Sequence, residues 1–184
     1  MHNREKINEK ELIKRLKDPS TQSCAFSEVV RQYSEPLYWH IRHMILSHDD
    51  TNDLLQITFI KAWSNIEKFR GDSQISTWLY RIAINETLTF LNKYTPTISI
   101  DSPEASIVEQ LEGDTYFNGT QAEKTFQEAL QSLPPKQRMV FNMKYYEEMK
   151  YEEISKLLGT SVGALKASYH IATKKIEEFL KNKD

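Results

Sequence analysis

The sequence of 184 residues is long enough for one domain or two small ones, and its content of only 5 glycines and 6 prolines favours helices. A single cysteine among five scattered histidines excludes an internal disulfide framework and metal sites of the Cys₄ or Cys₂His₂ type, so we expect neither cofactor nor metal. The formal net charge is −2, and because no stretch resembles a signal peptide or a membrane span, the sequence indicates a cytoplasmic protein.

Two helices are predicted in the N-terminal quarter of the chain. The first residues are polar and charged, and a short helix is expected over residues 11–16, where the following Pro19 stops it. From residue 25 to residue 44 the apolar residues recur at helical spacing. Pro36 lies within this stretch, and we expect it to kink or divide the helix.

The next predicted helix, over residues 49–69, begins with acidic residues that suit the positive end of a helix dipole. One face of this helix is apolar, and the opposite face carries Asp53, Gln56, Ile57, Ile60 and Ser64. Isoleucines are unexpected on a free surface. Two interpretations follow: either the helix packs on two sides within the protein, or this face binds another protein.

A loop over residues 69–73 leads into a helix predicted over residues 76–93, which has three distinct faces. Two faces are apolar, which indicates a central position in a bundle. Between them lies a stripe with an aromatic ring, a cation and polar groups: Trp78, Arg81, Asn85, Thr89 and Asn92. This chemistry suits stacking on unpaired bases and hydrogen bonding to them, although an ordinary solvated stripe would show the same pattern.

The stretch from residue 95 to residue 121 is acidic and contains turn formers and scattered apolar residues, so we expect a flexible linker with little packing of its own. The net charge is +1 over residues 1–93, −5 over 94–125 and +2 over 126–184. Phosphate neutralisation supplies most of the non-specific affinity for DNA. The weakly charged ends therefore predict poor DNA binding by the isolated chain, and a partner that supplies the missing charge.

The C-terminal region predicts a helix-turn-helix. Helices are expected over residues 121–133 and from Pro135 through Tyr146. A short helix then starts at Tyr151 and breaks at Gly159, and a long helix follows. The outward face of this last helix carries Gly163, Lys166, Ala167, His170 and Lys174. Small residues would let the backbone approach a DNA groove and lysines would bind phosphates or guanines, whereas the alternative is a surface helix with ordinary lysines.

Five segments of the chain carry specific signatures. In the N-terminal part they are DLLQITFIKAW at 53–63, FRG at 69–71 and STWLYRIAINE at 76–86. In the C-terminal part they are LPPKQRMVF at 133–141 and YEEISKLLGTSVGALK at 151–166. Both sets, in this order and at this spacing, resemble the extracytoplasmic-function sigma factors of bacterial RNA polymerase, and the resemblance covers about residues 22–182.

The resemblance implies an all-α fold of two small helical domains joined by the flexible acidic linker, with a helix-turn-helix in the second domain. The expected ranges are 1–94 for a region 2 domain, 95–121 for the linker and 122–184 for a region 4 domain. It also implies a non-enzymatic protein that directs RNA polymerase core to promoters and initiates DNA-templated transcription. The expected partners are the largest subunits of the polymerase core, promoter DNA and an anti-sigma factor, with no small-molecule substrate.

Three groups of site residues follow from the resemblance. Docking on the clamp helices of the polymerase is expected of Asp53, Gln56, Ile57 and Ile60. Opening of the minus-ten element and capture of a flipped base are expected of Phe69, Arg70, Gln74, Trp78, Arg81 and Asn85. Reading of the minus-thirty-five element as duplex is expected of Ser161, Gly163, Lys166, Ala167, His170 and Lys174. The linker is expected in the polymerase channel. This division suits the physics, because melted bases need stacking surfaces and amide groups, whereas a duplex admits a helix to its major groove.

Four positions depart from the family pattern. Ile57 stands where many members have an acid, and Ser168 stands where the recognition helix often has an arginine. Thr89 and Asn92 stand where the minus-ten helix usually has an aspartate and an arginine. The lost arginines predict an altered promoter preference.

Two other functional classes can be compared with this one. A stand-alone helix-turn-helix regulator would use only the C-terminal unit, and it would have no use for an aromatic stripe and an exposed apolar face in a second bundle. An enzyme is disfavoured, because the sequence lacks a glycine-rich phosphate loop, a nucleophile motif and metal-ligand spacing. The acidic cluster near Asp49 fits a helix start better than a carboxylate site.

Overall fold

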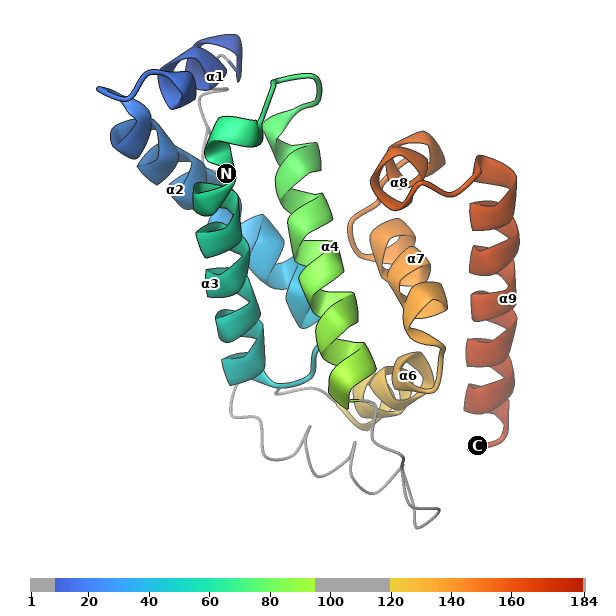
Figure 1. The fold of residues 1–184 in the computed structure, drawn as a ribbon. Coiled ribbons are helices and arrows are strands. Elements are labelled where there is room, and N and C mark those ends of the chain that lie inside the picture. Colours follow the sequence, from blue (N-terminus) through green and yellow to red (C-terminus); the bar gives the residue numbers. More distant parts are fainter. Residues whose placement is uncertain (1–8, 95–119, 184) are drawn as a thin grey trace.

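The computed structural model describes residues 9–94 and 120–183, and within these ranges the chain forms α-helices, one short 3₁₀ helix and no strand. Figure 1 shows two groups of helices lying side by side, α1 to α4 and α6 to α9. The prediction of two small all-α domains is therefore confirmed. The helical part of the second domain begins at Gln121, and residues 95–119 of the predicted linker lie outside the described residues.

The helix bounds follow the predicted pattern closely, with one exception: the helix predicted over residues 49–69 ends at Ser64 and is followed by a separate 3₁₀ helix. In the N-terminal domain they are α1 Glu9–Lys17, α2 Gln22–Arg42, α3 His48–Ser64, the 3₁₀ helix η1 Ile66–Lys68 and α4 Ile75–Tyr94. In the C-terminal domain they are α6 Gln121–Gln131, α7 Pro135–Tyr145, α8 Tyr151–Leu158 and α9 Val162–Lys181. Pro36 lies inside α2 without dividing it, and buried side chains before it (Val29) and after it (Leu37 and Ile41) hold both halves in the bundle.

The N-terminal domain packs α2, α3 and α4 around an aliphatic core. Its largest fully buried side chains include Leu37, Ile41, Met44, Ile75 and Leu79. The inner face of α3 is more polar than the sequence pattern indicated, because Thr51 and Thr58 are fully buried there. The Thr58 hydroxyl donates to the Leu54 carbonyl at 2.8 Å, so its burial leaves no unpaired donor.

The start of α3 explains the acidic cluster seen in the sequence. The Ser47 side chain caps the helix by accepting a hydrogen bond from the Asp50 backbone N–H at 3.2 Å. Asp49 and Asp50 lie in the first turn, where their charges complement the helix dipole. The interpretation of these carboxylates as a helix start is consistent with this geometry.

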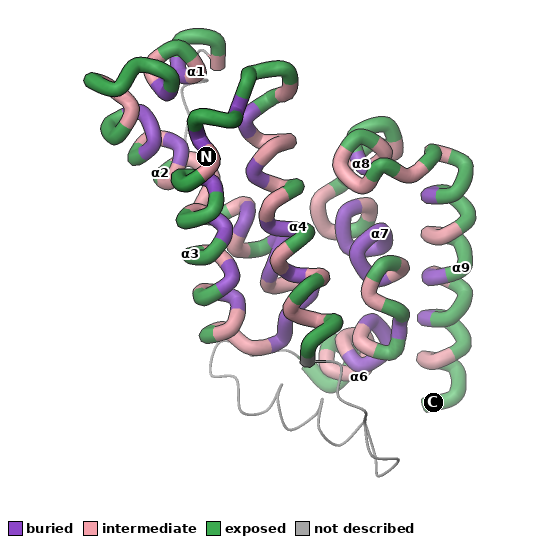
Figure 2. The backbone as a smooth tube through the Cα atoms, viewed as in Figure 1, coloured by how far each residue is buried: buried purple, intermediate pink, exposed green. Residues whose placement is uncertain are grey.

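The C-terminal domain contains a helix-turn-helix formed by α8 and α9. Gly159 ends α8 in the left-handed conformation, with φ of 64°. Ser161 then caps α9 by accepting a hydrogen bond from the Ala164 backbone N–H at 3.3 Å. Figure 2 shows that α7 is buried along most of its length, next to α9. This packing fixes the angle at which α9 presents its outer face.

The two domains also pack against each other, an arrangement we call the closed arrangement. Helix α4 contacts both α7 and α8, and side chains of the two domains share one hydrophobic cluster. His40 of α2 lies 2.7 Å from Glu147 (Nδ1 to Oε1), and the His40 side chain is only 1% exposed. The ring of His43 stacks on Tyr146 with centroids 4.1 Å apart, and Asn142 donates to the His43 carbonyl at 2.8 Å.

Burial in this interface perturbs His43. Burial lowers the pKa of its imidazole from the ordinary 6.5 to about 4, and this outweighs the opposing attraction of the Glu147 carboxylate. His43 is therefore neutral near pH 7 in the closed arrangement.

Among the described residues, no helix is both long and apolar enough to span a lipid bilayer.

Candidate functional site

The outer face of α3 presents an apolar strip with polar neighbours. Ile57 is 39% exposed and Ile60 is 62% exposed, while Asp53 and Gln56 are exposed beside them. Packing of α3 on two sides within the protein, one of the two interpretations of this face, is therefore wrong. Trp63, 41% exposed, extends the strip but was absent from the predicted set, although its spacing of three from Ile60 could have identified it.

Trp78 and Phe69 form a stacked pair at the start of α4. Phe69 is only 6% exposed, and its ring lies 4.8 Å from the Trp78 ring, centroid to centroid, at an interplanar angle of 28°. Phe69 therefore does not lie at the surface in this structure, and its role at the minus-ten element stays a prediction. The Phe69 ring is buried because it stacks on Trp78, which is itself half-buried.

The loop between Phe69 and α4 exposes two of the predicted residues, Arg70 and Gln74. Arg70 forms an ion pair with Asp72 at 3.1 Å, but both side chains are largely exposed, at 85% and 75%. Exposed pairs of this kind contribute little to stability. The guanidinium of Arg70 can therefore exchange this partner for a phosphate at little cost.

The polar stripe predicted on α4, which we call the α4 ridge, continues along the surface beyond Trp78. Arg81, Asn85, Thr89 and Asn92 are all exposed. Asn85 lines a shallow hollow of about 320 Å³, whose other lining residues are Lys61, Asn65, Lys68, Trp78, Ile82 and Glu86. The hollow thus combines an aromatic ring, amides and the cation Lys68, while its other cation, Lys61, is ion-paired with Glu86 at 2.6 Å. This is the combination that binds an unstacked base and its phosphate.

A larger cleft of about 930 Å³ opens between the N-terminal domain and α8. The loop from Phe69 to Gln74 and the first turns of α4 form one wall, and Glu153, Lys156 and Leu157 of α8 contribute to the other. Arg81 crosses the cleft and donates to the Lys156 carbonyl at 2.6 Å. Sequence reasoning did not identify Lys156 as a neighbour of Arg81, because no periodic signal relates residues that lie in separate domains.

The outer face of α9 presents its predicted residues to solvent. Gly163, Lys166, Ala167, His170 and Lys174 are all exposed. A Cβ at Gly163 would meet no atom within 4 Å, so the glycine is not required by packing within the chain. Ser161 is also exposed, and its hydroxyl caps α9 through the Ala164 amide. The α9 face therefore combines two small residues, Gly163 and Ala167, with the cations Lys166 and Lys174.

Comparisons with known proteins identify both domains. Residues 29–96 match the family model of Sigma-70 region 2, and residues 123–176 match that of Sigma-70, region 4. The chain is 31% identical over 160 residues to the ECF RNA polymerase sigma factor SigW of Bacillus subtilis, across 79% of this chain and 83% of that protein. It is 26% identical over 183 residues to the ECF RNA polymerase sigma-E factor of Escherichia coli K12, across 94% of each.

Two solved structures share the fold. CnrH, solved in complex with the cytosolic domain of CnrY, aligns with a TM-score of 0.70 at 22% identity and covers 96% of this chain and 99% of that one. The sigma factor RpoE from Bartonella quintana, solved with the anti-sigma factor NepR, aligns with a TM-score of 0.62 at 22% identity, covering 85% and 96%. With two sigma regions in order and relatives matched over most of their length, the chain belongs to the extracytoplasmic-function family of RNA polymerase sigma factors.

Proposed function

We propose that this sigma factor, which is not an enzyme, reads promoters with two surfaces and binds core RNA polymerase with a third. The N-terminal domain, over residues 1–94, would bind the polymerase and the minus-ten element. The C-terminal domain, over residues 122–184, would bind the minus-thirty-five element. The observation that carries the proposal is the simultaneous exposure of the α4 ridge and the α9 outer face on separate domains. A stand-alone regulator is not favoured, because such a protein has no need of the matched region 2.

The minus-ten surface is built to bind melted DNA. Phe69 supports Trp78 from beneath, so the indole can act as a fixed stacking platform. Arg81 supplies a cation, and Asn85 supplies both a donor and an acceptor to the edge of a base. Bases inside a duplex cannot reach such a surface, so binding here favours a flipped, unpaired strand.

The minus-thirty-five surface is built to enter an intact duplex. The α9 face has no side chain at Gly163 and only a methyl group at Ala167, which allows close contact with a groove wall. Lys166 and Lys174 lie on the same face, where they can neutralise phosphates or donate to guanines. Each phosphate contact makes the affinity more dependent on salt.

The polymerase surface has the composition of a protein interface. The centre of this surface is apolar and can lose its water on binding; it consists of Ile57, Ile60 and Trp63. Its polar neighbours are Asp53 and Gln56. Apolar anchors enclosed by polar groups carry most of the energy in such interfaces. Ile57, at the position where the family resemblance implies an acid, adds a further apolar contact here.

The closed arrangement cannot read both DNA elements at once. Elements about 25 base pairs apart, as the names minus-ten and minus-thirty-five state, are separated by about 85 Å of duplex, since each base pair adds about 3.4 Å. In the closed arrangement α8 lies against α4, and α9 is only about 30 Å long. Residues 95–119 can span at most about 85 Å when extended, which is enough for separated domains. Opening of the closed arrangement is therefore part of the proposed function, and it adds a second cause of poor DNA binding by the free chain.

One further partner and a location belong to the proposal. CnrH was solved in complex with the cytosolic domain of CnrY, and RpoE in complex with the anti-sigma factor NepR, and we extend an anti-sigma partner to this chain. A cytoplasmic location follows from the proposed partners, because core polymerase and promoter DNA are found there.

Reconstituted transcription with core polymerase over a promoter library tests the proposal. Asn85→Ala should impair promoter opening while polymerase binding stays intact, because the amide faces DNA in this scheme. Gln56→Ala or Asp53→Ala should instead weaken polymerase binding. If the isolated chain binds promoter duplex tightly and core polymerase adds nothing, the stand-alone regulator is the better description.

A further inference from the structure

We infer that α1 sets the shape of the loop between Phe69 and α4, with Glu9, Ile13 and Lys17 as positioning residues for recognition of the minus-ten element. This inference rests on the proposed function of the loop. Helix α1 precedes residue 29, where the match to Sigma-70 region 2 begins. The role of α1 is therefore not part of the matched region.

Both ends of the loop are hydrogen-bonded to α1. Lys17 Nζ donates to the Arg70 carbonyl at 2.9 Å. Glu9 Oε1 accepts from the Ile75 backbone N–H at 2.7 Å, at the first residue of α4. The first N–H groups of a helix have no partner within it, and a carboxylate there also complements the helix dipole. Glu9 thus caps α4 from 66 residues away in the sequence.

The middle of the loop rests on Ile13. Gly71 has φ of +82°, a conformation that side chains other than glycine rarely adopt. A Cβ at this position would lie 3.3 Å from Ile13 Cγ2 and 3.9 Å from Lys17 Nζ. The glycine therefore allows the backbone to lie directly on α1. Together with the two hydrogen bonds, this gives three points of support along the loop.

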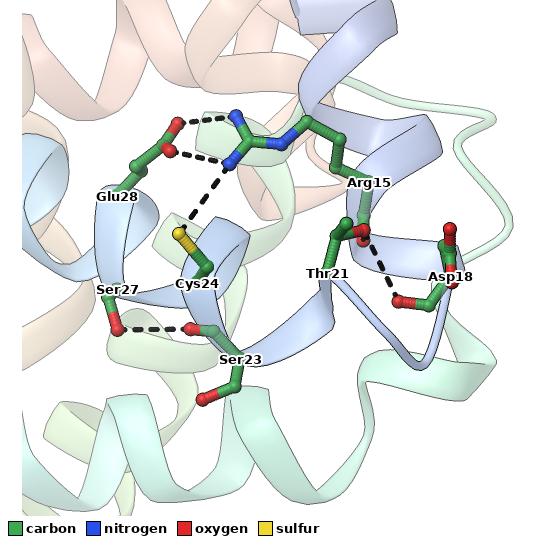
Figure 3. Close-up of polar contacts among 7 residues, drawn as sticks. All are labelled: Arg15, Asp18, Thr21, Ser23, Cys24, Ser27 and Glu28. Atoms are coloured by element: carbon green, nitrogen blue, oxygen red, sulfur yellow. Dashed lines mark hydrogen bonds and ion pairs between the residues drawn. The ribbon is translucent and has the colours of Figure 1, made fainter.

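Helix α1 is itself held firmly on α2. Leu12 and Leu16 are each only 2% exposed and anchor α1 in the core. Arg15 donates from two nitrogens to the two carboxylate oxygens of Glu28, at 2.9 and 2.6 Å (Figure 3). The Thr21 hydroxyl donates to the Arg15 carbonyl at 2.8 Å, which ties the end of α1 to the start of α2. The support beneath the loop is therefore a fixed one.

This arrangement holds the backbone of the loop and leaves its reading side chains exposed. Arg70, Asp72 and Gln74 all lie at the surface, whereas the contacts with α1 involve the carbonyl of Arg70 and the Cα of Gly71. A loop that is ordered before DNA arrives loses less conformational entropy when it binds. It also presents the same side chains to every promoter, which sharpens discrimination between sequences.

The test compares variants of α1 in the holoenzyme, made with the full chain and core polymerase. Lys17→Met and Glu9→Ala each remove one hydrogen bond to the loop, and Lys17→Arg and Glu9→Gln each keep a donor or an acceptor. Lys14→Met, one turn earlier on α1, is the matched charge control. The measurement is open-complex formation on the cognate promoter and on one with a substituted minus-ten element, with polymerase affinity measured in parallel.

We expect Lys17→Met and Glu9→Ala to reduce discrimination between the two promoters by about fivefold each, the equivalent of one hydrogen bond. Polymerase affinity should not change, and the conservative variants and Lys14→Met should behave as the unaltered protein. Hydrogen exchange of the free chain adds a direct readout, in which Glu9→Ala should accelerate exchange of the Ile75 amide.

Gln74→Ala separates failure of this inference from failure of the proposed function. If Gln74→Ala lowers discrimination while Lys17→Met and Glu9→Ala do not, the loop reads DNA but α1 does not position it. If Gln74→Ala also has no effect, the loop is not the reader, and the inference fails with the proposed function. Unchanged exchange at Ile75 in Glu9→Ala would overturn the cap directly. If Glu9→Ala prevents folding, Lys17→Met alone decides.

Discussion

Glu147 is the residue whose replacement tests the closed arrangement most directly. Its carboxylate contacts His40 of the other domain at 2.7 Å, and the His40 side chain is 1% exposed. Glu147→Asn shortens the side chain and breaks this contact. Glu148→Asn is the matched control, because Glu148 is exposed and its φ of 52° is one that asparagine adopts readily.

The size of the effect follows from the burial of His40. Leaving a buried polar group without its partner costs about 1–3 kcal/mol. In the open state both groups reach water, so the cost falls on the closed arrangement alone. The ratio of open to closed molecules should therefore rise by about 5- to 150-fold, given about 1.4 kcal/mol per factor of ten.

Resonance energy transfer between the domains measures this ratio. Cys24 is the only cysteine of the chain and is exposed on α2, so it accepts one dye, and a Lys181→Cys substitution on α9 accepts the other. Glu147→Asn should lower the transfer efficiency and increase the affinity of the free chain for promoter DNA, while Glu148→Asn should change neither. Equal transfer in both variants would refute the reasoning that this contact holds the domains together.

Three further outcomes are expected. The same transfer assay should show opening as the pH falls from 7 to 5. The pKa of His43 is about 4 in the closed arrangement and the ordinary 6.5 when the ring is exposed, so protons bind the open form more tightly and the closed arrangement loses up to about 2 kcal/mol over this range. His43→Gln should remove this pH dependence. Gly163→Ala should raise the free energy of unfolding by up to about 1 kcal/mol, because alanine favours the helix and its methyl group meets no atom of the chain. The same variant should reduce transcription from promoters that depend on the minus-thirty-five element. Normal transcription would contradict close contact between α9 and the groove. Ile60→Ala should weaken binding to core polymerase by about tenfold in a titration without changing stability, and unchanged affinity would contradict the role of this face.

Helical periodicity was sufficient to predict the fold class and nearly all helix bounds. The α4 ridge and the α9 face could also be predicted, since both depend on the 3.6-residue period within one helix. The inner face of α3 was harder to predict. Thr58 is counted as polar in any pattern, but its hydroxyl bonds to the carbonyl four residues earlier and can be buried like an apolar group.

Contacts between distant segments could not be predicted from the sequence. Phe69 lies in a loop, where sequence pattern does not indicate burial, and its ring is buried because it stacks on Trp78. His40 and Glu147 are 107 residues apart, and neither belongs to a motif. The roles of the polymerase- and DNA-facing residues stay predictions until the complexes are measured.

The hydrogen bond from Arg81 to the Lys156 carbonyl couples two properties that an engineer would want to adjust independently. A substitution at this position that retunes promoter choice also alters how strongly the resting molecule is held shut. Variants selected only for a new promoter sequence would then also differ in how much transcription they start without a signal. Screens of this protein should therefore measure unsignalled transcription and promoter selectivity together.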